Sequence, residues 1–387
     1  MRKRLYYIIC MCASVLLMFS SCTDDSADGT EEVRMHELHL SLSTHQFNMT
    51  RAAGDLPDAF VNYDHTEALA KIMQIQCYMA YHGAEAADYV PCVFNYTNES
   101  NKDIWTSTVP LKSLTDNKRY YLYGYMPKSN VNGNVSIAPY NNDYKKGAVL
   151  TLSDLNAVTP DDVCVIVGAE GYGSGTKPNI PDMSRRLGVF DYYPETDGGN
   201  IFLLIDHLYA GLQFNFSLGE KYSQLRSIKI KTIKLIPEDG DKAVIESVTA
   251  VVTVVANSLG KNPIVPILSG EGVNTGGSVE YKDKKTGTNP KPAVLFEGEK
   301  ELTQTAEKFM ACFCPATNTK FILETTYDVY DRKGNLIRLN DIARNTIELK
   351  RDMNAGQIHI VNITVQPTFL YMLSDPDLDN PTFRIEN

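Results

Sequence analysis

Apolar and polar residues alternate along many short segments of this 387-residue chain, and Gly, Pro, Asn and Asp residues bound those segments. A period of two is typical of β-strands that bury one face. The pattern predicts strands at residues 35–42, 73–81, 120–126, 163–167, 201–205, 209–218, 226–236, 244–255, 308–314, 320–330 and 356–366. Helical spacing is confined to two short stretches, 66–71 and 111–115. We therefore expect a mainly β protein built from sandwiches.

The length of the chain and one turn-rich segment predict two globular domains. At about 100–200 residues per domain, this chain is long enough for two. Residues 194–200 (PETDGGN) separate an N-terminal domain at 52–200 from a C-terminal domain at 201–367. The polar segment 269–292 is rich in Gly and Lys, and we expect an exposed loop or a long hairpin end there.

The first residues predict an exported, lipid-anchored precursor. Residues 1–21 form a signal peptide, with three basic residues followed by an apolar run at 5–19 that is too short to span a bilayer. The run ends in Ser-Ser-Cys22, which resembles the lipobox of bacterial lipoproteins, so we expect Cys22 to carry lipid in the outer membrane. The alternative is an ordinary secretory signal with an incidental cysteine. The acidic stretch 23–32 follows as a flexible tether within the segment 22–51.

Charge and motif spacing narrow the classes of function. The formal net charge is −10, from 37 Lys and Arg against 47 Asp and Glu, so we expect no nucleic-acid partner. The glycines at 168–175 follow an apolar strand, but Pro178 and Pro181 prevent the helix that a phosphate-binding loop requires. The seven histidines show no metal-ligand spacing. We therefore expect neither an enzyme nor a cofactor.

The cysteines outside the signal segment do not predict a disulfide framework. Five remain, an odd number with irregular spacing: Cys77, Cys92, Cys164, Cys312 and Cys314. Cys77 and Cys164 lie in apolar, strand-like runs, so we interpret them as small buried hydrophobic residues.

One acidic set near the C-terminus has the spacing of a calcium loop. Asp375, Asp377, Asp379 and Glu386 stand at positions 1, 3, 5 and 12 of such a loop. Prolines within the set stiffen it, and the chain ends at Asn387 without a second helix. The favoured interpretation is a tight turn between two short strands, so the expected metal content is none.

Four motifs carry a resemblance to a known family. They lie at residues 48–54 (NMTRAAG), 121–127 (YLYGYMP), 206–216 (DHLYAGLQFNF) and 353–365 (MNAGQIHIVNITV). In this order and spacing, over most of its length, the chain resembles the fimbrillins (type V pilins, the major and minor fimbrial subunits) of Bacteroidetes. The resemblance implies two transthyretin-like β-sandwich domains, lipoprotein export, trimming by an Arg-specific protease and polymerisation by strand exchange.

The residues around the first motif fit that implied processing. Leu38, Leu40 and Leu42 share one face of the predicted strand 35–42, so this strand can fill a slot in the core of a sandwich. Cleavage between Arg51 and Ala52 would release it together with the lipid on Cys22. A sandwich that loses a strand exposes unpaired backbone groups, which are a template for another strand.

The C-terminal tail, 368–387, is the candidate replacement strand. Its apolar positions are Phe369, Leu370, Tyr371, Met372, Leu373, Phe383 and Ile385. A tail this apolar is expected to be buried, either in a neighbouring subunit as a donor strand or in its own domain.

These observations predict a structural subunit of a surface fimbria that supports adhesion. Its expected partners are other fimbrial subunits, outer-membrane lipid and an Arg-specific protease, and the host receptor is unknown. Two alternatives stay open. One is a fimbrial tip adhesin, and the other is a monomeric surface lipoprotein that binds a host glycan or protein.

Overall fold

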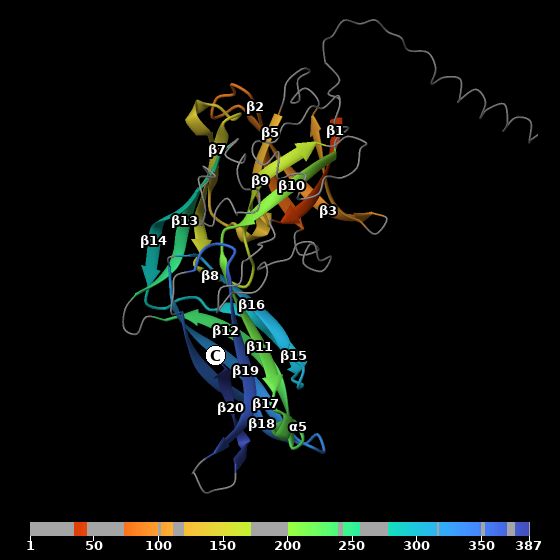
Figure 1. Cartoon of the computed structure of the whole chain (residues 1–387), viewed down its shortest axis with the longest axis vertical. Helices are drawn as coiled ribbons and strands as arrows, with labels where there is room; N and C mark the ends of the chain where they lie inside the picture. The colour runs from red at the N-terminus through yellow and green to blue at the C-terminus, as the bar shows by residue number, and fades with distance from the viewer. Residues whose placement is uncertain are drawn as a thin grey trace, which may run out of the picture. The chain divides into compact units, whose positions relative to one another are not determined.

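The computed structural model describes residues 35–44, 73–99, 102–110, 120–171, 200–238, 243–255, 278–315, 317–349, 353–369 and 376–386. All of them belong to one compact unit, Met35–Asn387 (Figure 1). Strands dominate this unit, which confirms the prediction of a mainly β protein. No helix among the described residues is long and apolar enough to cross a bilayer.

Strands follow one another with few helical turns between them. The strands are β1 (Met35–Thr44), β2 (Gln74–Tyr81), β3 (Tyr89–Glu99), β4 (Lys102–Pro110), β5 (Tyr120–Met126), β6 (Val135–Pro139), β7 (Gly147–Asn156), β8 (Val158–Thr159), β9 (Cys164–Gly171), β10 (Asn200–His207), β11 (Ala210–Leu218), β12 (Arg226–Pro237), β13 (Val244–Val255), β14 (Ser278–Gly287), β15 (Ala293–Glu301), β16 (Glu307–Phe313), β17 (Lys320–Asp331), β18 (Leu336–Glu348), β19 (Ile358–Phe369) and β20 (Pro376–Glu386). The helical turns are η2 (Lys128–Asn130), η3 (Tyr140–Asn142) and α5 (Glu220–Ser223).

Seven strands form a closed barrel in the order β1-β10-β9-β5-β2-β3-β4. Its interior is apolar, and the buried side chains there include Leu38 of β1, Trp105 of β4 and Leu203 of β10. The strands β5 and β2 approach closely at Gly124, where a Cβ atom would overlap the carbonyl of Gln76. A glycine at this position is therefore a packing requirement.

A second sheet, in the order β14-β13-β7-β6, covers one side of the barrel (Figure 1). Alternate residues of β7, such as Leu150 and Leu152, pack against the outward face of β5, where Tyr121, Tyr123 and Tyr125 lie. Strand β5 is consequently buried on both faces, which explains its unbroken apolar sequence.

The remaining strands form a sandwich of two sheets, β20-β19-β11-β16-β8 and β15-β12-β17-β18, which we call the second sandwich; its interior is the second core. The two sheets share one core, to which β11 contributes Phe214 and Phe216 and β12 contributes Ile228 and Ile230. The lysines between these isoleucines lie on the other face, as the period-two pattern at 226–236 predicts.

Strand pairing crosses the expected domain boundary at residues 200 and 201 in both directions. β13 pairs with β7, which comes from the first half of the chain, and β8 pairs with β16, which comes from the second half. The assignment of 52–200 and 201–367 to two domains remains a prediction, but the sheets themselves combine segments from both ranges.

All eleven predicted strands are present. The structure also contains strands that were not predicted, because their sequences lack a recognisable apolar pattern. β14 and β18 are exposed along most of their length, so they carry no clear apolar alternation. Of the two expectations for 269–292, the loop is wrong over 278–287, because those residues form the exposed strand β14 and pair antiparallel with β13, as the arm of a long hairpin does. The predicted helical turns at 66–71 and 111–115 lie outside the described residues.

Candidate functional site

Strand β1 occupies a slot between two strands that come from distant parts of the chain. It runs antiparallel to β4, with Leu38 opposite Ser107, and parallel to β10, with Leu42 opposite Leu203. The side chain of Leu38 is completely buried in the barrel interior. In the described part of the chain, β1 is the strand that joins β4 to β10 and so closes the barrel.

The slot has the properties that a replaceable strand requires. Without β1, the facing edges of β4 and β10 would present unpaired N–H and C=O groups, each of which costs about 1–3 kcal/mol if it stays buried. Burial of a leucine such as Leu38 contributes about 1.5–3 kcal/mol. Any extended segment with apolar residues at alternate positions could pair with these two edges and bury an apolar side chain in the same way. Leu40 also lies on β1, and the register places it opposite Trp105.

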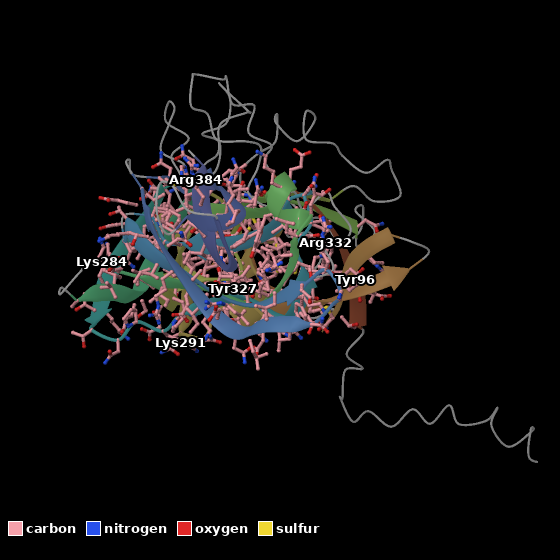
Figure 2. All side chains as sticks on the ribbon, turned by 90° about the horizontal axis from the view of Figure 1, so that it is seen from below. Tyr96, Lys284, Lys291, Tyr327, Arg332 and Arg384 are labelled. Atoms are coloured by element: carbon pink, nitrogen blue, oxygen red, sulfur yellow. The ribbon has the colours of Figure 1, made fainter. Side chains whose placement is uncertain are left out.

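The C-terminal strand β20 pairs antiparallel with β19 of the same chain. Phe383 is buried in the core of the second sandwich, where its ring lies 4.8 Å from Tyr327 and 6.3 Å from Phe216 between centroids. Ile385 packs against the same core. The neighbouring residue Arg384 points to solvent, whereas Tyr327 lies inside (Figure 2).

The other predicted tail residues are only partly placed. Phe369 is the last residue of β19. Leu370, Tyr371, Met372 and Leu373 lie outside the described residues, as do Cys22, Arg51 and Ala52.

The acidic residues of the candidate calcium loop lie along a strand. Asp377, Asp379 and Glu386 belong to β20, while Asp375 is outside the described residues. The ladder is irregular between Pro367 and Thr368, yet residues on either side of this point pair with β20. Pro367 pairs with Pro381 and Thr368 with Asp377, so residues 378–380, Asp379 among them, have no partner on β19.

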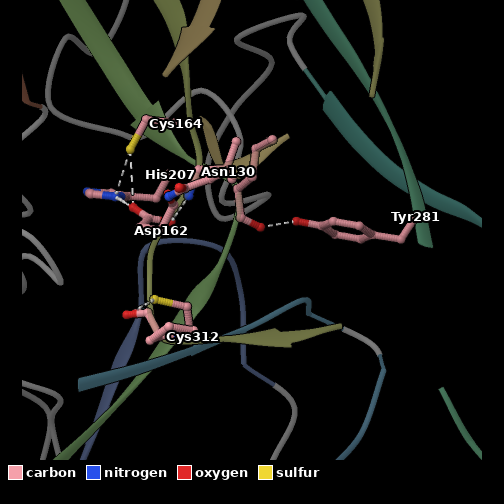
Figure 3. A network of polar contacts seen from close by, with 9 residues as sticks. Asn130, Asp162, Cys164, His207, Tyr281 and Cys312 are labelled. Atoms are coloured by element: carbon pink, nitrogen blue, oxygen red, sulfur yellow. Dashed lines mark hydrogen bonds and ion pairs between the residues drawn. The ribbon is translucent and has the colours of Figure 1, made fainter. Parts of the chain in front are cut away.

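Sequence reasoning missed a buried polar cluster at one end of the β9–β10 pair. Asp162 precedes β9, and Cys164 and His207 lie directly opposite each other on β9 and β10 (Figure 3). The side chains of Asp162 and His207 are 2% and 1% exposed. We call Asp162, Cys164 and His207 the corner cluster.

The carboxylate of Asp162 is the acceptor at the centre of the corner cluster. The distance from His207 Nδ1 to Asp162 Oδ2 is 2.6 Å, and that from Cys164 Sγ to the same oxygen is 3.1 Å. Which of the two atoms, His207 Nδ1 or Asp162 Oδ2, carries the proton of their hydrogen bond depends on the tautomer of the histidine. The N–H of Val163 donates to Oδ1 at 2.8 Å, and Asn130 donates to the backbone carbonyl of Asp162 at 2.9 Å.

The chemistry of the corner cluster favours a structural role. The three candidate ligand atoms lie within 4.8 Å of one another, as a metal site requires. However, nitrogen and oxygen ligands of a tetrahedral zinc ion stand about 3.3 Å apart, given bonds of about 2.0–2.1 Å, and the observed 2.6 Å matches a hydrogen bond. A nucleophile relay is also excluded for this cluster, because the thiol and the carboxylate contact the same histidine nitrogen.

Two other strands contact the segments of chain next to the corner cluster (Figure 3). The hydroxyl of Tyr281 on β14 donates to the carbonyl of Leu208, and the N–H of Leu208 donates to the carbonyl of Val163 at 2.8 Å. The thiol of Cys312 on β16 contacts the carbonyl of Pro160 at 3.8 Å. The corner cluster therefore lies beside the point where the barrel, the covering sheet and the second sandwich are connected.

We predict that His207→Ala lowers the free energy of unfolding by about 3 kcal/mol, because it leaves the Asp162 carboxylate buried without its closest hydrogen-bond partner. Denaturant unfolding of the purified protein measures this loss. His82→Ala is the matched control, since His82 lies 3.3 Å from Asp143 but is 61% exposed, and its loss should cost under about 1 kcal/mol. Equal losses in the two variants would contradict the role given to the corner cluster.

We predict that Phe383→Ala lowers the free energy of unfolding of the isolated monomer by about 3–5 kcal/mol, because it removes an aromatic ring from the second core. Arg384→Ala on the exposed face of β20 should change it by no more than about 0.5 kcal/mol. Thermal or denaturant unfolding of monomeric protein distinguishes the two. If Phe383→Ala were as stable as the wild type, β20 would not be docked on its own sandwich in solution.

Comparisons with known proteins give matches among solved structures alone. No family model matches the chain, and no curated protein matches it. A candidate cell adhesion protein from Bacteroides fragilis is 9% identical, with 91% of this chain and 98% of that chain covered and a TM-score of 0.43. A fimbrial protein from Bacteroides vulgatus is 12% identical, with 90% and 98% covered and a TM-score of 0.32. The fimbrial anchor protein from Porphyromonas gingivalis is 9% identical, with 90% and 95% covered and a TM-score of 0.26.

Proposed function

We propose that this chain is a structural subunit of a cell-surface fimbria and supports adhesion. In this proposal the precursor is exported as a lipoprotein through Cys22, trimmed after Arg51 and polymerised by donor-strand exchange. The partners are other fimbrial subunits, and the mature form is located in the fimbria. We assign it no enzymatic activity.

The observation that carries the proposal is the position of β1. This strand closes the barrel from within, between β4 and β10, and it is followed by the basic residue Arg51 in a polar stretch suited to protease access. Cleavage there would separate β1 from the rest of the chain and would leave an open slot. An isolated subunit with an open slot exposes apolar interior and unpaired backbone, and a strand from a second subunit removes both costs.

The tail 368–387 is the proposed donor. It ends in a strand in which the buried Phe383 and the half-buried Ile385 flank the exposed Arg384, so its pattern suits a slot with one apolar wall. Leaving its own sheet would expose these residues, and insertion in a neighbour would bury them again. In the slot the donated strand would pair with two strands, β4 and β10, whereas in its own sheet β20 pairs with β19 at an edge, and head-to-tail insertion propagates a filament.

A second candidate function is supported by the pairing of β20 with β19. A subunit whose tail stays on its own sandwich can accept a strand but cannot donate one, which is the behaviour expected of a fimbrial tip adhesin. The two functions differ in whether the tail crosses between chains.

We predict that Arg51→Ala leaves the protein monomeric and attached to the membrane, because β1 stays in its slot. N-terminal sequencing of assembled wild-type material should begin at Ala52. Arg34→Ala is the matched control, since Arg34 precedes β1 and cleavage there would not release the strand. Fibres built from chains that begin at Cys22 would refute the processing step.

We predict that deletion of 368–387 yields Arg51-trimmed monomers that accept a strand but do not form fibres. Because the deletion also removes Phe383 from the second core, a cross-linking experiment tests the same point in a full-length chain. Cysteines replace Leu373 in the tail and Ser107, which lies opposite Leu38 on the slot. Cross-links between chains support donation, whereas cross-links only within single chains, or normal fibres without the tail, would favour the tip function.

A further inference from the structure

Two buried cysteines lie directly opposite each other in the wall of the barrel. Strands β2 and β3 are antiparallel, and their register pairs Cys77 with Cys92. Both side chains belong to the barrel interior, with exposed fractions of 0% and 7%. The flanking pair on the same face, Ile75 and Phe94, is also completely buried.

This register provides the backbone geometry of a disulfide. Residues that face each other in an antiparallel pair have Cα atoms about 4.5–5.5 Å apart and side chains on the same face. A disulfide requires Cα atoms about 4.4–6.8 Å apart. The spacing of an antiparallel pair thus falls within the range that a disulfide requires, although both cysteines are free thiols in the structure.

We propose that Cys77 and Cys92 form an intrachain disulfide in the exported protein. The inference rests on the export step of the proposed function, because disulfides form and persist outside the cytosol. The two thiols lose two protons and two electrons as the S–S bond forms. An exported thiol–disulfide oxidant accepts them, and its own disulfide is reduced to two thiols.

The other described cysteines lack this arrangement. Cys164 and Cys312 contact oxygen acceptors, Asp162 and Pro160 respectively. Cys312 and Cys314 are two residues apart on one extended segment, which places their Cα atoms about 6.6 Å apart, near the limit for a bridge. Oxidation is thus expected to be selective for the Cys77–Cys92 pair.

Burial determines when the bond can form. Desolvation raises the pKa of the Cys92 thiol to about 12 and holds the pKa of Cys77 well above its usual range. Because the thiolate is the reacting species, both groups are inert in the closed barrel. The bond therefore forms while β2 and β3 are paired but the interior is still open, and the finished barrel then protects it from reduction.

The location of the pair connects it to the slot. Cys77 and Cys92 lie in the same core as Leu38 and Trp105, the residues that β1 contributes or faces. A covalent bond between β2 and β3 would limit the loosening of this core while β1 is absent. The disulfide would thus stabilise the subunit in the interval between trimming and strand insertion.

The test uses full-length protein recovered from the surface of native cells and a second sample refolded in a glutathione redox buffer. In denaturant, which exposes the buried cysteines, free thiols are alkylated before reduction, and a second alkylating reagent is added after it. One tryptic peptide, 72–102, contains Cys77 and Cys92 and no other cysteine, while peptide 309–320 contains Cys312 and Cys314. We expect both cysteines of peptide 72–102 to be labelled only after reduction, and both cysteines of peptide 309–320 to be labelled before it.

Labelling of peptide 72–102 before reduction, in either sample, would overturn the proposal. If the protein is absent from the cell surface, the export step fails, and the redox-buffer sample alone decides whether the pair closes. A thermal measurement checks the consequence: the Tm of the wild type and of Cys312→Ala should be about 5 °C lower for protein refolded with a reductant than for protein refolded in the redox buffer. The Tm of the double variant Cys77→Ala, Cys92→Ala should not respond to reductant, and a wild type that behaves like this variant would also overturn the proposal.

Discussion

The backbone of β1 bonds to two strands at once, and the closed form of the barrel depends on this double pairing. Its two neighbours, β4 and β10, are separated by about ninety residues of sequence and have no ladder with each other among the described residues. One inserted segment therefore satisfies both edges and fills the interior with Leu38. Because the slot recognises an extended backbone and alternate apolar residues, its occupant does not have to belong to the same stretch of chain.

The two ends of the described chain contribute in the same physical manner to different cores. Leu38 on β1 fills the barrel, and Phe383 on β20 fills the second sandwich. Each terminal strand is joined to the rest of the fold by ladder hydrogen bonds and a few apolar contacts. Terminal strands of this kind can separate from a fold without disrupting the order of the remaining strands, which is the property that strand exchange between subunits requires.

Polar and sulfur-containing side chains in the interior occur where strands must be held in register. Asp162 is surrounded by hydrogen-bond partners, so its burial is compensated within the corner cluster. Cys77 and Cys92 occupy paired positions in the barrel wall, where a covalent bond would replace a packing contact. The corner cluster and the Cys77–Cys92 pair lie in different parts of the barrel. The hydrogen bonds of the first, and a covalent bond in the second, would each restrict the relative movement of neighbouring strands.

The amino-acid sequence by itself determined the fold class and the positions of the strands that bury one or both faces. The alternation at 226–236 and the unbroken run at 120–126 both correspond to observed strands, because burial acts on each strand with a period of two. Exposed strands such as β18 carry no such pattern and were not predicted. Only the tertiary structure decided which strands are neighbours, including β13 with β7, Cys77 with Cys92 and Cys164 with His207. The periodicity of a strand defines its faces, but its partner and register depend on packing between segments that are far apart in the sequence.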